Sequence, residues 1–450
     1  MSNNHHAPGL SFTEFFRAFP EFRRDPLGFM FALTHRHGHV VRFRGAWVTH
    51  QITHPLDVER VLQTNAQNYR KGRSFRRLRP ISGNGLLFSD GELWRRQRRL
   101  VQPAFQRQRL GAYAPAITRA TAALVTRWRA YAASGEAFDV LHEMMRLALD
   151  IIGQTIFGTD LSGDIETISR SIDVVRAFSI KRLWQVFPRP LSLPTRDNRE
   201  FQRAVGAADH VILDMIAARR AGTVNSDDLL SRLVNATDAE TGAKMDDEQL
   251  RAEVVTFLTA GHESTAVALT WLWYLLAQNE AAEERLRAEL RRVLDGRTPA
   301  LADLPQLNYT LMCIEEAMRL YPPVWVTGRT ALGADTLGGY AIAPNSELLL
   351  SAYITHRHPD FWDEPDVFNP ERFTPEQIAA RPRYAYYPFG GGPRQCVGNN
   401  FALLEMLLVV AAIAQRFRLR LVPTHKVEAD PSITLRPRNG VRVTLHEIEN

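Results

Sequence analysis

Apolar positions recur at helical spacing through most of the chain. From about residue 92 to 295, long segments rich in Ala, Leu, Arg and Glu predict helix. A break is expected over residues 187–197, where three prolines forbid a continuous helix. The longest predicted helix covers about residues 246–278. Two more are expected, one over residues 308–321 that ends at a Pro-Pro pair and one from about 398 to 415.

Shorter segments carry the alternation that is typical of strands. Residues 39–53 alternate apolar and polar side chains around Gly45, which predicts a pair of strands. Residues 416–446 alternate again, and Asn439-Gly440 is a turn sequence that favours a hairpin. Residues 340–395, rich in Pro, Gly and aromatic side chains, are expected to be irregular.

No linker, low-complexity tract or repeat divides the 450 residues. A hydrophobic content of 45% is enough for a large core, and it excludes disordered and fibrous proteins. We therefore expect one mainly α-helical domain over residues 1–450. Short helical patterns near the start are expected to break at Pro20 and Pro26, with residues 1–20 as a flexible tail.

Charge and cysteine content narrow the class of protein further. The net charge is +6, but no nucleic-acid motif surrounds the basic clusters, so an acidic protein partner is favoured over nucleic acid. Two cysteines exclude a disulfide framework and favour a reducing compartment, the cytoplasm. The first residues lack the pattern of a signal peptide, and no run of about 18 apolar residues occurs, so we expect no membrane span.

Candidate chemistry concentrates in residues 389–398, FGGGPRQCVG. Glycines let the backbone adopt conformations closed to other residues and approach a flat group. Cys396 just precedes a predicted helix, whose dipole and free N–H groups favour a thiolate. A lone cysteine beside such a turn is more often a buried structural residue. A zinc site is disfavoured, because Cys313 is the only other thiol.

The spacing Phe-Gly-x-Gly-x-Arg-x-Cys-x-Gly resembles the haem-binding signature of the cytochrome P450 family, and the resemblance extends over about residues 20–445. It implies the family's fold, a triangular helical prism with small β-sheets. It also implies a monooxygenase that inserts one oxygen atom of dioxygen into its substrate. Haem b is the implied cofactor, with Cys396 as axial ligand of the iron, because a thiolate there favours O–O cleavage. Gly390 and Phe389 are expected beside it, the glycine exposing amides and the ring acting as an apolar shield.

The sequence AGHEST lies in the middle of the longest predicted helix. Ala260 and Gly261 remove side-chain bulk where a ligand approaches. The acid Glu263 and the hydroxyls of Ser264 and Thr265 predict a proton relay beside a local bulge that holds a water. Taken alone, an amphipathic helix with one tolerated glycine explains the segment equally well. The family resemblance favours the relay, with Ser264 where the family has threonine and Thr265 as a substitute donor.

A second group of charged residues has an expected structural role. Glu316 and Arg319 can pair on one helix face, although Glu315 also reaches Arg319. The resemblance selects Glu316 and adds Arg372 from the segment FNPERF. We expect these three residues to form a buried charge network without a catalytic role.

Haem carries two propionates, which need strong partners when they are buried. The resemblance assigns this role to four residues, each of which alone is more often a solvated side chain. They are Trp94, Arg98, Arg329 and Arg394. Three further arginines near Arg98 either dock an acidic electron donor or simply face water. They are Arg95, Arg96 and Arg99.

The regions that resemble the family's substrate pocket are mostly apolar, which predicts an apolar small-molecule substrate. The candidate lining residues are Phe75, Leu87, Phe257, Val324, Val326 and Ile433. Any one of these is more often plain core. The arginines of the expected loop after Arg70 either recognise a carboxylate, as in a fatty acid, or face water; they are Arg73, Arg76, Arg77 and Arg79. Terpenoid, fatty acid and steroid-like substrates all remain open, with hydroxylation as the expected outcome.

Redox partners follow from the resemblance. No flavin or ferredoxin domain is recognisable in the sequence, so a separate ferredoxin or flavodoxin with its reductase is implied, passing electrons from NAD(P)H to a monomeric enzyme. A peroxide-driven peroxygenase or a haem-thiolate isomerase is one alternative, which the acid and alcohol at Glu263 and Ser264 disfavour. A haem-binding sensor or carrier without turnover is the other.

Overall fold

The computed structural model describes residues 6–45, 47–159, 163–185, 188–224, 227–238 and 240–448. Its backbone contacts divide the chain into two compact units. Unit 1 consists of Met1–Arg76, Glu315–Cys396 and Ala429–Arg436, and unit 2 of Arg77–Ile314, Val397–Glu428 and Pro437–Asn450. The expected single domain over the whole chain stays a prediction.

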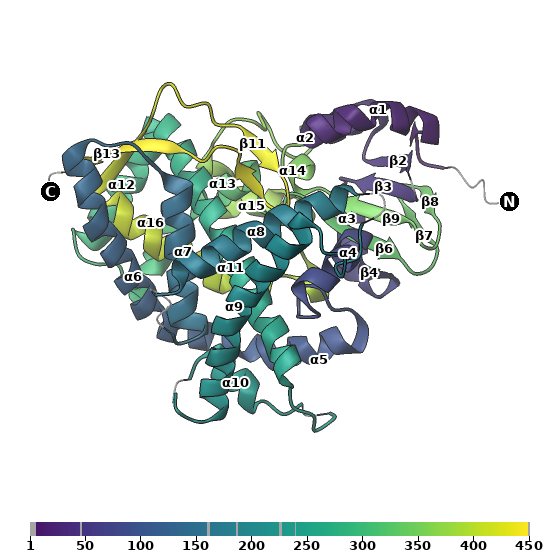
Figure 1. Cartoon of the computed structure of the whole chain (residues 1–450). Coiled ribbons are helices and arrows are strands. Elements are labelled where there is room, and N and C mark those ends of the chain that lie inside the picture. Colours follow the sequence, from purple (N-terminus) through teal and green to yellow (C-terminus); the bar gives the residue numbers. More distant parts are fainter. Residues whose placement is uncertain are drawn as a thin grey trace. The chain divides into compact units, whose positions relative to one another are not determined.

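Unit 1 is built on a six-stranded sheet in the order β1-β2-β3-β9-β6-β4 (Figure 1). The strands are β1 (Gly9–Leu10), β2 (Val40–Arg44), β3 (Val48–Ile52), β9 (Glu347–Leu350), β6 (Thr327–Ala331) and β4 (Tyr69–Lys71). The antiparallel pair β2 and β3 confirms the prediction for residues 39–53. On one side of the sheet, buried Val40, Ile52 and Leu348 belong to an apolar cluster. A short hairpin joins β7 (Asp335–Leu337) to β8 (Tyr340–Ile342).

Helices and turns complete unit 1. The helices are α1 (Phe12–Arg24), α2 (Pro26–His37), α3 (Pro55–Glu59), α14 (Ala352–Thr355) and α15 (Pro375–Ala380). The turns are η1 (Arg60–Thr64), η2 (Ala66–Asn68), η5 (Pro370–Phe373), η6 (Arg383–Ala385) and η7 (Gly392–Arg394). The segment expected to be irregular, residues 340–395, contains strands up to β9, and after β9 it alternates short helices and helical turns with irregular stretches.

A flexible tail was expected over residues 1–20, but residues 12–20 belong to helix α1, so this expectation is wrong for them. Residues 1–5 lie outside the described residues. Ser11 and Glu14 form a capping box that starts α1. The ring of Phe15 stacks on Phe43 of β2 at 5.1 Å, which holds the helix on the sheet. Pro20 lies inside α1 without ending it. The carbonyl that it leaves unpaired belongs to Phe16, whose side chain is exposed, so water can hydrate it.

Unit 2 is mainly helical. Its helices are α5 (Gly91–Val101), α6 (Arg107–Ser134), α7 (Val140–Ile156), α8 (Ile165–Trp184), α9 (Arg196–Arg220), α10 (Leu229–Asn235), α11 (Asp247–Gln278), α12 (Glu280–Leu294) and α16 (Asn399–Ala414). The turns η3 (Gln102–Phe105) and η4 (Leu301–Gln306) connect some of them. Long α11 packs against α7 and α9 (Figure 1), and side chains from Thr265 to Leu276 are buried apart from Tyr274. These helices confirm the predicted ones, including the break before α9.

Two predictions of local structure are wrong. The segment after Arg70, expected to be a loop, contains α4 (Arg73–Ser82), which like α13 (Asn308–Leu320) runs from one unit into the other. Asn439-Gly440 does not close a hairpin between its flanking strands. Before it, β12 (Leu435–Pro437) pairs with β11 (Ala429–Pro431); after it, β13 (Arg442–Glu447) pairs with β10 (Phe417–Leu421) and β5 (Phe138–Asp139).

The turn itself has the expected backbone, because Gly440 has a φ of +70°. A Cβ on Gly440 would lie 2.2 Å from the carboxylate of Asp139, which also accepts a hydrogen bond from the N–H of Val441 at 2.9 Å. The turn is thus anchored on β5, and its flanking strands join different sheets. No helix of the described residues is long and apolar enough to cross a membrane.

Candidate functional site

The cysteine loop of unit 1 closes on itself through backbone hydrogen bonds. The N–H of Cys396 donates to the carbonyl of Phe389 at 2.9 Å, and the N–H of Gln395 donates to Gly392 at 3.1 Å. Residues 389 and 396, the two ends of the loop, therefore lie side by side. Cys396 is exposed, whereas Cys313 is buried. The thiol at the end of the glycine loop is the one that a ligand can reach.

The three glycines of this loop do not share one role. Gly390 and Gly392 have φ values of +69° and +62°, which other residues rarely adopt. A Cβ on Gly392 would lie 1.8 Å from the carbonyl oxygen of Leu62, and one on Gly391 would lie 2.4 Å from the ring of Tyr384. A Cβ on Gly390 would meet nothing within 4 Å. The positive φ of two glycines confirms the expectation of conformations closed to other residues, and Gly391 and Gly392 also let the loop pack against its own chain. The approach of a flat group stays a prediction.

These observations test whether the residues suit haem. Cys396 offers an exposed soft ligand, and Gly390 leaves the backbone beside it uncovered. Two residues later Gly398 caps α16, and no side chain caps this N-terminus. The amides of the first helical turn and the helix dipole favour a thiolate at this point of the chain. The donor set fits a haem iron held through sulfur.

The acid and hydroxyl residues of α11 lie on an unbroken helix, so the expected bulge is absent among them. The Oγ of Ser264 donates to the carbonyl of Ala260 at 2.7 Å, and the Oγ1 of Thr265 donates to Gly261 at 3.2 Å. A carbonyl has two lone pairs, so these bonds can add to the helical ones without opening the helix. Ala260 is exposed and Ser264 half-buried, while Glu263 and Thr265 are buried.

Exposure therefore separates the two hydroxyls. Ala260 and Ser264 stand one turn apart on the accessible face of α11. Thr265 is only 4% exposed and faces the core of unit 2. Gly261 has a packing role, because a Cβ there would lie 2.4 Å from Ile152 of α7. The arrangement favours Ser264 over Thr265 as the group that meets a ligand.

The four residues expected at the propionates divide between the units. In unit 1, Arg329 is buried on β6, where its Nη1 donates to Gly328 O at 2.9 Å and Thr327 Oγ1 at 3.2 Å. Arg394 lies half-buried in η7, two residues before the exposed cysteine. In unit 2, Trp94 and Arg98 are both half-buried and lie one turn apart on α5. Their role at haem stays a prediction.

The basic patch on α5 is partly neutralised within the chain. Arg99 contacts Asp238 at 3.0 Å and Glu240 at 2.9 Å. Arg95 pairs with Glu92. Two of the three arginines expected to attract an acidic donor thus already have acidic partners, which weakens the docking interpretation.

The candidate pocket residues of unit 1 form two groups. The indole N–H of Trp325 donates to the carbonyl of Ser432 at 3.0 Å, and the N–H of Leu435 donates to Pro323 at 2.9 Å. These bonds hold the turn of Ile433 against the segment of Val324. Both side chains are exposed, at 38% and 43%, while Val326 packs beside the Trp325 cluster. Phe75 is half-buried, with the ammonium of Lys71 4.4 Å from its ring centre.

In unit 2 the candidates are less accessible. Phe257 is buried and stacks on Phe105, with ring centres 5.6 Å apart, and Leu87 is half-buried. Beside them lies a residue that the sequence analysis missed. Glu253 accepts hydrogen bonds from the N–H of Leu86 at 3.0 Å and the amide of Gln249 at 2.9 Å. Burial raises the pKa of Glu253 to about 7. The sequence did contain a sign of this residue, because Glu253 lies one helical turn before Phe257 and so falls on the apolar face of the helix.

The arginines of α4 bind within the chain. Arg73 donates to the carbonyl of Asn345 at 3.2 Å and lies 3.7 Å from Glu347. Arg79 donates to Phe88 at 2.7 Å, and Arg77 donates to Gln185 at 3.3 Å. The structure thus favours a structural role for these three over recognition of a substrate carboxylate.

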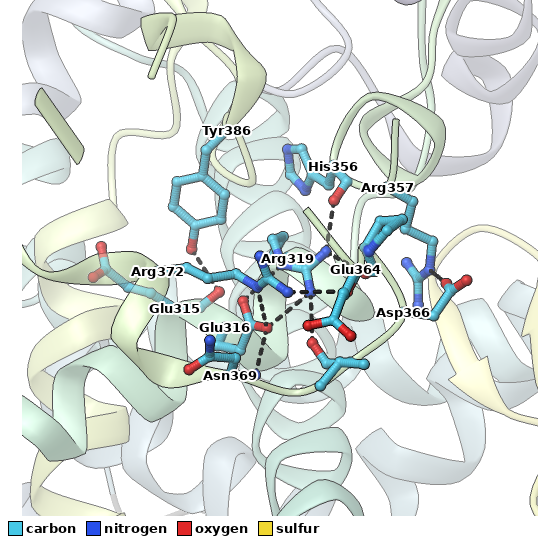
Figure 2. A network of polar contacts seen from close by, with 12 residues as sticks. Glu315, Glu316, Arg319, His356, Arg357, Glu364, Asp366, Asn369, Arg372 and Tyr386 are labelled. Carbon is cyan, nitrogen blue, oxygen red and sulfur yellow. Dashed lines mark hydrogen bonds and ion pairs between the residues drawn. The ribbon is translucent and has the colours of Figure 1, made fainter. Parts of the chain in front are cut away.

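Figure 2 shows the three residues expected to form a charge network, which the structure brings together. The Nε and Nη2 of Arg319 donate to the carboxylate of Glu316 at 2.6 and 2.8 Å, and both residues are fully buried. Arg372 lies 3.5 Å from the same carboxylate. Glu315 accepts no bond from Arg319 but lies near Tyr386, and burial raises its pKa to about 7.

Comparison with known proteins adds independent information. The family model described as Cytochrome P450 matches residues 8–444. The chain is 39% identical to cyclooctatin synthase of Streptomyces melanosporofaciens, over 92% of this chain and 89% of the relative. It is 36% identical to cyclooctat-9-en-7-ol 5-monooxygenase of the same organism, over 89% and 86%. The crystal structure of the cytochrome P450DA haem domain matches 99% of this chain and 98% of that one, with a TM-score of 0.88 and 25% identity.

Proposed function

The chain belongs to the cytochrome P450 family of haem-containing monooxygenases, and from this premise we propose that it hydroxylates an apolar, terpenoid-like substrate. The observation that carries the proposal is the exposed Cys396 at the end of a closed glycine loop, directly before an uncapped helix. Haem, when bound, supplies the activation of dioxygen. Among the residues of this chain, Cys396 would hold its iron, and Trp94, Arg98, Arg329 and Arg394 would bind its propionates.

Proton delivery is the proposed task of α11. Glu263 provides an acid, and the half-buried Ser264 provides a hydroxyl on the accessible face. The Ser264 hydroxyl donates to the carbonyl of Ala260 in this structure. To donate a proton to a bound ligand, it would have to break this hydrogen bond. Thr265 would have to leave the core of unit 2 to do the same.

Three observations support a terpenoid-like substrate. The first two relatives are named for cyclooctatin and cyclooctat-9-en-7-ol, the second of which is an unsaturated alcohol. Arg73, Arg77 and Arg79, which could bind a carboxylate, donate hydrogen bonds within the chain. The accessible candidates Val324 and Ile433 are purely aliphatic, which suits a hydrocarbon skeleton.

Electron supply is proposed to come from NAD(P)H through a separate ferredoxin or flavodoxin with its reductase. A monomer and a location in the cytoplasm are part of the same proposal. Arg99 of α5 already pairs with two acidic residues of this chain. We therefore do not include Arg99 in the surface that would bind the electron donor.

The test begins with the absorbance difference spectrum of the dithionite-reduced protein with and without carbon monoxide. A far-red-shifted Soret band is expected for the wild type and for the matched control Cys313→Ala, and its loss for Cys396→Ser. Wild-type protein with haem but without this band would contradict thiolate ligation. Turnover of terpenoid alcohols is then compared between dioxygen with a ferredoxin and reductase, and peroxide alone. Equal turnover with peroxide alone would favour a peroxygenase.

A further inference from the structure

Two histidines and an aspartate meet at the surface of unit 1, and none of them is a candidate haem, substrate or charge-network residue. His39 stands just before β2, and His358 and Asp360 follow α14. The Nε2 of His39 lies 3.1 Å from the Oδ2 of Asp360, although 321 positions separate the two residues. The Nδ1 of His358 lies 3.6 Å from the same oxygen. Each residue offers one ligand atom, and the three atoms lie within 4.8 Å of one another.

The hydrogen bonds of Thr53 permit a tautomer of His39 that suits a metal ligand. In this tautomer the hydroxyl of Thr53 donates to the carbonyl of His39 at 3.3 Å. Its oxygen, 3.1 Å from the Nδ1 of His39, can then only accept from that nitrogen. The neutral ring is left with a bare Nε2 that faces a carboxylate oxygen. Two acceptors at this distance attract each other only if a proton or a metal ion lies between them.

The distances suit a single ion. A ligand–metal distance of about 2.1 Å for both atoms turns a 3.1 Å separation into an angle of about 95° at the metal, and a 3.6 Å separation into about 118°. Both angles bracket the tetrahedral value of about 109°. Binding through the Nδ1 of His358 replaces a hydrogen bond that this atom accepts from the N–H of Asp360 at 3.2 Å. The ion therefore binds through this atom only after the side chain of His358 has given up that bond and rotated toward it.

The surrounding residues bury most of the two imidazole rings but leave the carboxylate accessible to an ion from solvent. The side chains of His39 and His358 are 23% and 14% exposed, and that of Asp360 is 60% exposed. The ring of Phe361 packs 5.6 Å from that of His39 and 5.4 Å from that of His358. His39 is held in place from behind, because its carbonyl accepts the N–H of Thr53 at 3.0 Å. An ion can reach the carboxylate from solvent and complete its coordination with water.

We propose that His39, His358 and Asp360 bind one divalent transition-metal ion, with Zn²⁺ as the ion that this ligand set favours. Imidazole and carboxylate are common zinc ligands, whereas Ca²⁺ and Mg²⁺ prefer oxygen alone. The ion would fasten the start of β2 to the loop after α14 and so stabilise unit 1. The site is independent of the haem chemistry.

The experiment is a calorimetric titration of the haem-loaded protein, produced without a polyhistidine tag, with Zn²⁺. We expect one equivalent to bind, and the dissociation constant to rise at least about tenfold in His39→Gln and in Asp360→Asn. His210→Gln is the matched control, because His210 and Asp214 form an exposed pair at 3.3 Å for which no third ligand is found among the described residues. This control should bind Zn²⁺ as the wild type does.

X-ray absorption at the zinc edge, which haem iron does not obscure, gives a second measure on wild-type protein alone. Two nitrogen ligands from histidine are expected in the first shell. The proposal is overturned if the wild type binds no Zn²⁺, if His39→Gln and Asp360→Asn bind it as tightly as the control, or if the first shell contains only oxygen.

Discussion

The buried Arg319 provides the sharpest test of the forces that hold unit 1 together. In Arg319→Met the side chain keeps a similar volume but loses its charge. The carboxylate of Glu316 then loses two charge-assisted hydrogen bonds of 2.6 and 2.8 Å. The carbonyls of His356, Pro365 and Val367 lose their donor as well. A fully buried carboxylate is left with the N–H of Asn369 at 2.9 Å and with Arg372 at 3.5 Å.

Removing one partner of a buried ion pair costs about 3–5 kcal/mol, because the other charge stays buried without compensation. Arg372 compensates in part, so we expect about 3 kcal/mol less free energy of unfolding. That is a large share of the roughly 5–15 kcal/mol of a typical protein. Arg319→Lys keeps the charge but not the two-pronged geometry, and its loss should be smaller.

Equilibrium unfolding in urea, followed by tryptophan fluorescence, measures these differences. Lys181→Met serves as the control, because Lys181 and Asp197 form an exposed pair at 3.2 Å. Such a pair contributes about 0–1 kcal/mol. If Arg319→Met costs no more than Lys181→Met, the reasoning from burial is refuted.

Three further predictions concern the cysteine loop and α11. Gly392→Ala should destabilise the protein by more than Gly390→Ala in the same urea assay. Both replace a glycine of positive φ, at about 1–2 kcal/mol each, but only the first adds a Cβ 1.8 Å from a carbonyl oxygen. Burial raises the pKa of Glu253 from 4.5 to about 7, so the folded state binds a proton that the unfolded state has lost, and stability falls as pH rises between these values. Glu253→Gln should remove this decrease in stability, which amounts to about 1.4 kcal/mol per pH unit. Urea midpoints of the wild type and the variant, measured from about pH 4.5 to 8, check this. If both proteins depend on pH in the same way, the carboxyl of Glu253 is ionised throughout this range. Ser264→Ala should lower the product formed per NAD(P)H consumed, and turnover by about 10²-fold, whereas Thr265→Ala should leave both nearly unchanged; the reverse order would move the relay to Thr265.

Local signals explain which parts of the fold the sequence predicts. The longest helix was expected over 246–278 and is observed over Asp247–Gln278. Its start is marked by Asp246, which accepts a hydrogen bond from the N–H of Gln249 at 2.8 Å. The pair β2 and β3 follows directly from alternation within residues 39–53. The glycine loop before Cys396 is equally local, since its motif spans ten consecutive residues.

The sequence misleads where one local pattern has several possible partners. Asn439-Gly440 specifies a turn but not the strands that pair across it, and β12 and β13 join different sheets. The arginines of α4 suggested a carboxylate site, yet Arg73 and Arg79 bind carbonyls of their own chain. For Arg319, by contrast, two acids were within reach, and the structure confirms Glu316, which the family resemblance had selected.

By itself, therefore, the sequence determined the family, the long helices and the thiol that can serve as a ligand, because each depends on residues close together in the chain. Only the tertiary structure decided that Gly261 and Gly392 are required by Ile152 and Leu62, distant residues that leave no room for a Cβ. It also decided that Ser264 is accessible while Thr265 is buried, since exposure depends on what packs around a helix. The meeting of His39 with Asp360 belongs to the same class, because folding alone brings together positions 321 residues apart.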